Sequence, residues 1–367
     1  MRKTIFIVTF ASLTPVAATA APMEALSADE AVAYADRRNP DIGALRAEVE
    51  ALRTRVAEDK GASRGEGAVA AAGSAEDLEE RLRASVLSVA EARLEHRRVL
   101  LAADVRSAFA RCSAARALLK LSEGSGIASD SALRLAEERR AQGREPAAAV
   151  EHARLGLARA RQEQALLEWK LARAASELLV LLGAPVTEAI PIKGSLPERS
   201  VPVGDFESLL ARALAERADL RAASKEYDAA LDAQSLGAKR RSRSKSEAGD
   251  SRSLPAILEE DGTAEVRITR AFRAMQSLKS GIAIDVAAAE TRVRNANVSV
   301  AASANVGLTS VDEQRKALLD AYRDGSMGLS QVLAALRDAW EVRRQEVLAL
   351  EELATAEADL RRALGAM

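Results

Sequence analysis

The chain has 367 residues, in which 53 Lys and Arg nearly balance 54 Asp and Glu, and only 3% of the residues are aromatic. This balance excludes the strong global field by which a protein gathers nucleic acid or an acidic substrate. Aromatic side chains bury the most area per residue, so their scarcity argues against a compact globular core. A chain rich in Ala, Leu, Arg and Glu instead predicts long helices in close contact, an all-α fold.

The first 20 residues have the pattern of a secretory signal peptide. Arg2 and Lys3 give a positive start, residues 5–13 an apolar stretch, and residues 18–20 an Ala-Thr-Ala cleavage site. An uncleaved N-terminal anchor is the alternative, although the stretch is short for a membrane span. We therefore expect an exported protein of the cell envelope.

Cys112 is the only cysteine of the chain. A single thiol excludes an intrachain disulfide, and its place on a helical face predicts plain packing. No cysteine follows the cleavage site, so we expect no lipid anchor there.

Prolines divide the rest of the chain in two. Pro185, Pro191, Pro197 and Pro202 follow one another closely, and each fixes its backbone and removes a hydrogen-bond donor. Residues 185–204 are therefore predicted to be an extended linker. The linker separates a first repeat, residues 21–184, from a second, residues 205–367.

The two halves align as a duplication. At an offset of 178, residues 39–44 face residues 217–222, and each run follows a short amphipathic helix. At an offset of 182, Gly143 faces Gly325, and Leu182-Gly183 faces Leu364-Gly365. The second half therefore carries four extra residues.

Each half is predicted to be one long antiparallel helical hairpin. The first outgoing helix spans residues 75–142, on the order of 100 Å at 1.5 Å per residue. Gly143 and Gly325 are the predicted turns, and each return helix ends at a leucine-glycine cap. Gly124 and Gly126, with residues 306–307 in the second half, predict kinks, and a second turn there is the alternative. The apolar face of the second return helix consists of Leu329, Val332, Leu333, Leu336, Trp340, Val347, Leu350, Leu353, Leu360 and Leu364.

Residues for bond chemistry are scarce. His96 and His152 are the two histidines, and neither has the Cys or acidic spacing of a metal site. No glycine-rich phosphate loop or nucleophile elbow occurs, and the paired carboxylates alternate with arginine as on solvated helix faces. The sequence predicts no catalytic residue, no cofactor and no metal, and thus not an enzyme.

These residues resemble the TolC-type outer-membrane efflux proteins over essentially the whole mature chain. That family opens each repeat with an NPDL-like run and an AExxAA run, which residues 39–51 and 217–230 match. Its return helix begins YxxG and closes with LG, which Tyr322, Gly325 and residues 364–365 match. The resemblance implies a homotrimer in which each subunit gives four helical strands to a twelve-stranded α-barrel. It further implies an outer-membrane β-barrel at one end and contact of the helix tips with a periplasmic adaptor and an inner-membrane pump.

The chain departs from the family where membrane strands are expected. Residues 59–77 and 235–262 occupy those places, and both read as polar loops rather than as strands of about 9–11 alternating residues. We therefore expect two tandem hairpins with little or no β-barrel. The cluster Lys239–Lys245 is predicted to lie in a solvated loop, with anionic head groups as the alternative contact and no role with nucleic acid.

The tips also differ from the family pattern. Gly143, Gly325, Val332 and Leu333 are the candidate tip and adaptor-contact residues, and simple turn or packing roles are the alternative. The acidic residues that often follow the tip glycine in the family are absent, since Gln331 and Ala334 stand there. A carboxylate gate therefore cannot be transferred to this chain.

Two hypotheses result. The first is a trimeric conduit for export of small molecules or ions across the outer envelope, working with a pump and an adaptor. The second is a degenerate, non-channel coiled-coil scaffold or partner-binding protein, soluble in the periplasm.

Overall fold

A computed structural model describes residues 26–64, 75–185, 193, 196, 202–247, 254–304 and 311–367. Within these ranges all regular elements are α-helices, as predicted. The predicted signal peptide and most of the linker lie outside them. The helices are α1 (Ala28–Arg38), α2 (Pro40–Arg64), α3 (Ala75–Ala141), α4 (Ala147–Leu182), α5 (Phe206–Glu216), α6 (Ala218–Glu247), α7 (Leu254–Ala304), α8 (Val311–Arg323) and α9 (Leu329–Leu364).

The duplication is visible in the helix bounds. Helices α1 and α5 have equal length, and so do α4 and α9. Among the described residues, positive φ angles occur at Gly143, Gly183, Gly325 and Gly365, which form two pairs at the offset of 182. Each half uses glycine, which has no Cβ to oppose this backbone, at its turn and at the end of its return helix.

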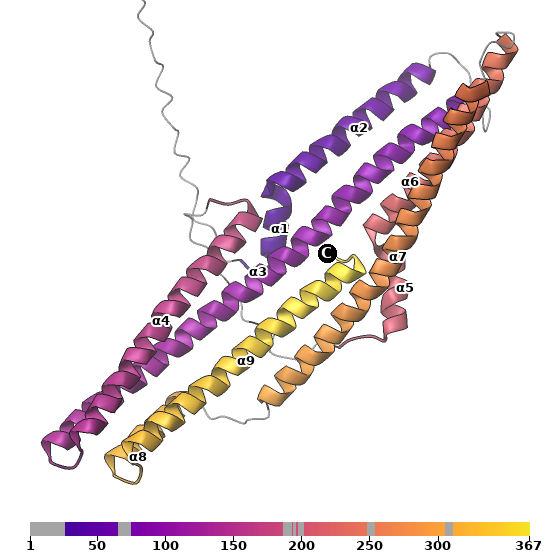
Figure 1. The fold of residues 1–367 in the computed structure, drawn as a ribbon. Coiled ribbons are helices and arrows are strands. Elements are labelled where there is room, and N and C mark those ends of the chain that lie inside the picture. The colour runs from indigo at the N-terminus through magenta and orange to yellow at the C-terminus, as the bar shows by residue number, and fades with distance from the viewer. Residues whose placement is uncertain are drawn as a thin grey trace, which may run out of the picture.

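Helix α3 is the spine of an elongated molecule (Figure 1). It spans 67 residues and contacts α4 and α9 toward the tips, and α2 and α6 toward the opposite end. Helix α7 packs on α6 and α9 along the other side. The two hairpins therefore lie side by side rather than as separate domains, with α2 and α4 along one edge and α7 and α8 along the other.

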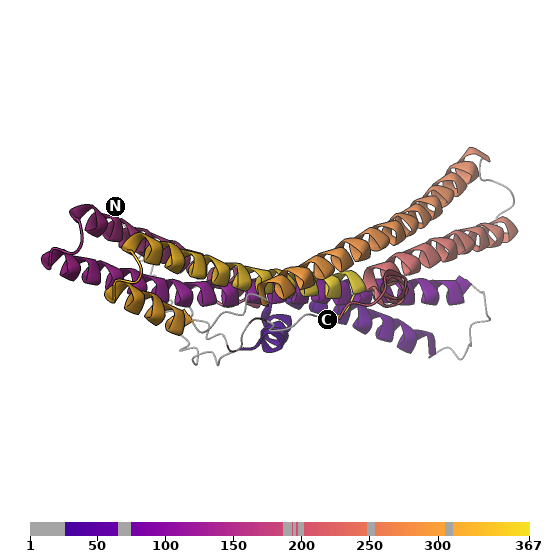
Figure 2. The ribbon, with the colours of Figure 1, turned by 90° about the horizontal axis from the view of Figure 1, so that it is seen from below.

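The helices form a curved layer (Figure 2). At the end that holds α2 and α6, the layer bends so that α7 rises away from α3. The short helices α1 and α5 lie near the middle, where each packs on the long helix of its own half. This arrangement leaves most of each long helix with neighbours on two sides only.

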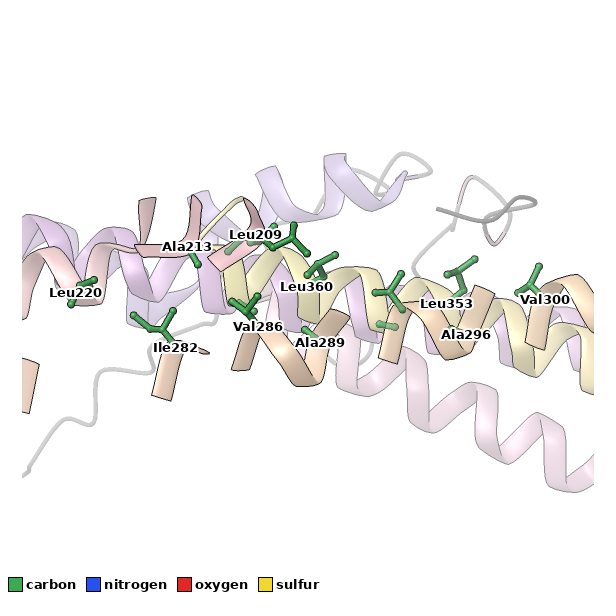
Figure 3. Close-up of a cluster of buried hydrophobic side chains, with 14 residues drawn as sticks. Leu209, Ala213, Leu220, Ile282, Val286, Ala289, Ala296, Val300, Leu353 and Leu360 are labelled. Atoms are coloured by element: carbon green, nitrogen blue, oxygen red, sulfur yellow. The ribbon is translucent and has the colours of Figure 1, made fainter. Parts of the chain in front are cut away.

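Each half has its own apolar core at this middle level. In the second half, Leu209 and Ala213 from α5 pack on residues of α6, α7 and α9 (Figure 3). The first half places Ala31 and Ala35 of α1 at the equivalent positions. Cys112 belongs to this first core, and its burial raises the pKa of the thiol to about 11, consistent with the predicted packing role. The second core consists of Leu209, Ala213, Leu220, Ile282, Val286, Ala289, Val293, Ala296, Val300, Leu353, Ala356, Leu360, Ala363 and Leu364.

The opening and closing motifs of each repeat meet at this level. A Cβ added to Gly183 would stand 2.7 Å from the Arg38 carbonyl oxygen, and one added to Gly365 would stand 3.0 Å from the Arg217 Cα. The side-chain amide of Asn39 donates a hydrogen bond to the Leu181 carbonyl oxygen at 3.1 Å. Each return helix is thus fixed against the helix pair that begins its own repeat.

Arg217 strengthens the second junction. Its guanidinium donates to Asp219 at 2.6 Å and to Asp285 at 3.0 Å. Burial opposes ionisation of Asp219, but the guanidinium outweighs burial and keeps the pKa of Asp219 below its usual value. The junction is therefore held by a charged pair as well as by close backbone packing.

The predicted bounds of the two polar loops, residues 59–77 and 235–262, are wrong, because helices extend into both segments. Residues 59–64 belong to α2 and 75–77 to α3, while 235–247 belong to α6 and 254–262 to α7. The basic cluster Lys239–Lys245 is thus helical rather than a loop. Ala, Glu, Lys and Arg are good helix formers, and Pro255 stands in the first turn of α7, where proline is tolerated.

The alternative of a second turn within the first long helix is wrong. Helix α3 continues through residues 123–126, and the kink predicted there stays a prediction. Glycine in a helix costs about 1 kcal/mol relative to alanine. Packing of α3 on α4 and α9 outweighs that cost. In the second half, residues 306–307 lie outside the described residues, between α7 and α8.

No helix in the described ranges combines the length and the apolar character that crossing a bilayer needs.

Three glycine-to-alanine variants test the junction. Gly43→Ala replaces a helical glycine with no neighbour within 4 Å and is expected to stabilise by up to about 1 kcal/mol. Gly143→Ala meets no neighbour but has φ +70, so it should cost about 1–2 kcal/mol. Gly183→Ala adds a backbone collision and should cost about 3 kcal/mol or more. Urea unfolding measures all three, and equal stability of Gly143→Ala and Gly183→Ala would refute the junction.

Candidate functional site at the helix tips

The two interhelical turns lie at the same end of the molecule (Figure 1). Gly143, at φ +70, turns the chain from α3 into α4, and Gly325, at φ +78, turns it from α8 into α9. The Gly143 N–H donates to the Arg140 carbonyl, and the Gly325 N–H donates to the Tyr322 carbonyl. Both predicted turn glycines are therefore found where the sequence placed them, and both are exposed.

Behind the turns, α3, α4, α8 and α9 form a small four-helix bundle. Its core is built from small residues of α3 and larger ones of α8 and α9, and Tyr322 is its largest fully buried side chain. This bundle joins the tip of the first hairpin to the tip of the second. The core consists of Ala132, Ala136, Val150, Ala153, Tyr322, Leu329, Val332 and Leu333.

Arg139 ties the two tips together. Its Nη1 donates to the Tyr322 carbonyl at 2.9 Å and to the Arg323 carbonyl at 3.4 Å, at the C-terminus of α8. Its Nε donates to Glu145 at 3.3 Å, and its guanidinium carbon lies 4.9 Å from the centre of the Tyr322 ring. A cation at a helix C-terminus satisfies free carbonyls and complements the helix dipole. Arg139 therefore makes one rigid unit of two turns that are far apart in sequence.

Val332 is fully buried and Leu333 is 8% exposed, both inside the tip bundle. This burial favours the alternative packing role for the two residues, and their contact with an adaptor stays a prediction. The first turns of α9, which carry both residues, pack in one apolar core with residues of α3 and α4. Gly143 and Gly325 remain as the exposed candidates.

Sequence reasoning missed Arg139 and Glu145. Neither residue stands out in the sequence, yet their side chains are only 19% and 14% exposed. No local pattern distinguishes Arg139 from Arg140, because its partner is a backbone carbonyl 183 residues away in sequence. Only the packing of the second hairpin on the first selects it.

The comparisons with known proteins bear directly on this fold. Residues 78–184, which cover most of α3 and all of α4, match the family model described as outer membrane efflux protein. A search of curated proteins found no match to the chain. The matched family is one of transport conduits.

Solved structures extend the likeness to the rest of the chain. The outer-membrane channel OprN has a TM-score of 0.72 and 17% identity, covering 93% of this chain and 90% of that one. VceC of Vibrio cholerae has a TM-score of 0.69 and 15% identity, covering 92% and 96%. The open state of MtrE from Neisseria gonorrhoeae has a TM-score of 0.68 and 15% identity, covering 92% and 89%. The chain therefore has the TolC-type helical fold, as the sequence motifs predicted.

The Arg139 contact predicts local instability when it is lost. Arg139→Gln removes the charge from the α8 C-terminus and is expected to speed amide hydrogen exchange in α8 and the Gly325 turn about tenfold, as a loss of 1–3 kcal/mol of local stability implies. Arg140→Gln is the matched control, because Arg140 is exposed and its side chain has no ion-pair or hydrogen-bond partner in the described part of the chain. Equal exchange in both variants would show that Arg139 does not hold the tips.

Tyr322 predicts a high-pH transition. Burial, and then the nearby Glu145 charge, raises the pKa of Tyr322 to about 12. Because the unfolded chain ionises near its usual pKa of about 10, the stability from this residue is full below pH 10 and is lost between about pH 10 and 12. Absorbance titration of phenolate should show one late tyrosine, and Tyr322→Phe should remove it. A late phase that persists in Tyr322→Phe would contradict the assignment.

Proposed function

We propose that the chain is the outer-envelope component of an efflux system, a homotrimeric helical conduit that passes small molecules or ions from an inner-membrane pump. The observation that carries the proposal is that the two edges of the helical layer both expose apolar side chains. A layer one helix thick cannot cover its own edges, whereas a ring of copies can.

One exposed stripe runs along α4. Its members are separated by three or eleven residues, spacings that return to nearly the same side of an α-helix. Trp169 is 57% exposed and Val180 is 63% exposed, although both are large apolar residues. The stripe consists of Leu155, Leu166, Trp169 and Val180.

A second stripe runs along α7, at the opposite edge. Val266, Ile284 and Val298 are separated by eighteen and fourteen residues, which again places them on nearly one side of the helix. Ile284 is 70% exposed and Val298 is 69% exposed. The face of α9 that the sequence singled out is, in contrast, largely buried against α3 and α7.

Two different apolar edges favour a head-to-tail ring. When one edge of a subunit meets the other edge of the next, the contact is heterologous and closes into a ring if the curvature allows. The layer is already curved (Figure 2). Exposed contiguous apolar surface of this kind marks an interaction site. A trimer, the state that the resemblance implies, would close the curve around an axial passage.

The tips are the end that we assign to the adaptor and the pump. Gly143 and Gly325 stand exposed at the ends of two rods that Arg139 holds at a fixed spacing. A rigid pair of turns repeated three times would give a partner a defined ring of contacts. Passage through such a conduit would need no bond chemistry.

One observation favours the alternative, a soluble periplasmic scaffold or partner-binding protein. Helix occupies much of residues 59–77 and 235–262, where the resemblance places the membrane segments of the family. Placement in the outer membrane is therefore the step of the proposal that needs the most direct test.

Envelope fractionation provides that test. The conduit proposal predicts that the full chain stays with outer membranes through alkaline carbonate extraction and is recovered in detergent as a trimer. Complete release as a soluble species would leave the scaffold as the better account.

A variant of the α7 edge tests the ring itself. The double substitution Ile284→Glu and Val298→Glu introduces charges that the contact would desolvate, and is expected to convert the trimer to monomer in sedimentation experiments. Ile127→Glu is the matched control, since Ile127 is 57% exposed but lies on the central helix α3. A trimer unaffected by the α7 substitutions would exclude this edge from the contact.

A further inference from the structure

A groove between α3, α4 and α9 lies just behind the tip bundle. It has a volume of about 310 Å³, within the range of sites that hold small organic molecules. Its walls combine hydroxyl, guanidinium and indole groups with leucine side chains. The lining residues that carry the argument are Ser125, Ser129, Arg159, Arg337, Leu333 and Trp340.

Two arginines in this groove have no carboxylate partner. Arg159 comes from α4 and Arg337 from α9, so they reach the groove from different helices. Among the described residues, neither makes an ion pair or a side-chain hydrogen bond, although most arginines of these helices do. The groove therefore presents two cations whose donors are available.

Two carboxylates, Glu163 and Glu341, also line the groove. Glu341 accepts two hydrogen bonds from Arg344, both at 2.9 Å, and one from Gln345 at 2.7 Å. Glu341, and more weakly Glu163, raises the pKa of the Arg344 guanidinium. Arg344 therefore offsets the charge of Glu341, and in the groove lining the two cations Arg159 and Arg337 outnumber the remaining carboxylate, Glu163.

Hydroxyl donors complete the polar side. Ser125 and Ser129 lie on consecutive turns of α3, and in the described part of the chain their hydroxyls have no hydrogen-bond partner. Guanidinium and hydroxyl groups together suit an oxyanion, which accepts hydrogen bonds and donates none. Trp340, Leu333 and Leu336 supply an apolar wall on the α9 side.

We propose that this groove binds organic anions, in which a carboxylate or a similar oxyanion meets Arg159 and Arg337 while an apolar or aromatic body lies against Trp340. The volume exceeds what an inorganic ion needs, and the α9 wall that carries Arg337 also offers apolar surface. This inference deepens the proposed function and rests on it in one respect, namely that the bound anions would be the class of cargo that the conduit passes.

Calorimetric titration of the purified full chain tests the groove. The probes are 2-naphthoate, its neutral amide 2-naphthamide, and a naphthylmethylammonium cation, which share one aromatic body. The groove predicts that naphthoate binds and that the amide and the cation bind at least tenfold more weakly. Equal binding of naphthoate and the amide, or no binding of naphthoate at millimolar concentration, would overturn the proposal.

Variants locate the site. Arg159→Gln and Arg337→Gln are each expected to weaken naphthoate binding about three- to tenfold, as the loss of one partly solvated ionic hydrogen bond implies. Arg161→Gln is the matched control, because Arg161 is also an exposed arginine of α4 but does not line the groove. Undiminished binding in the Arg159→Gln, Arg337→Gln double variant would place the anion elsewhere and refute the site.

The outcome separates this inference from the conduit proposal. Binding in the groove is measured on purified protein and needs neither a membrane nor a pump. A chain released by carbonate would fail as a conduit and still bind naphthoate if the groove is correct. A membrane-held trimer without naphthoate binding would keep the conduit and lose the anion site.

Discussion

A layer one helix thick has two edges that its own chain cannot cover, and this constraint governs the molecule. Helix α3 gains neighbours on both sides, because α4 and α2 lie along one side and α9 and α6 along the other. The helices at the edges have a neighbour on one side only. Helix α4 therefore exposes Trp169 and Val180 to solvent, and α7 exposes Ile284 and Val298. Since burial of such side chains is a main source of stability, we infer that other copies of the chain cover the apolar edges that the protomer leaves exposed.

Within the layer, the same contact in each repeat keeps the long helices in register. Each repeat closes where its terminal glycine packs against the residues that open it, Gly183 on Arg38 and Gly365 on Arg217. The cores that contain α1 and α5 both lie near the middle of the molecule. At the tips, Arg139 supplies the corresponding link between the hairpins. Two fixed levels are enough to align helices that otherwise touch through small side chains.

The sequence predicted what depends on local chemistry. Sequence patterns predicted the extent of α3, the turns at Gly143 and Gly325, and the repeat. They could do so because periodicity, proline and glycine act on the backbone over a few residues. The burial of Val332 and Leu333, the helical state of residues 235–247 and the Arg139 contact were not, because they depend on the packing of one hairpin on the other. The arginines of the anion groove were missed for the same reason, since Arg159 and Arg337 meet only through the fold.

Cross-linking of one edge to the other tests the central claim most directly. Trp169 on α4 and Val298 on α7 are exposed members of the two stripes. Both lie at the level of residues 351–353 of α9, because Lys170 acts on Glu351 and Val300 shares a core with Leu353. With Cys112→Ala as background, the pair Trp169→Cys and Val298→Cys should give covalent dimers and trimers with a short bis-maleimide, while either cysteine alone should give no trimer. A double variant that forms no product between subunits would contradict the account.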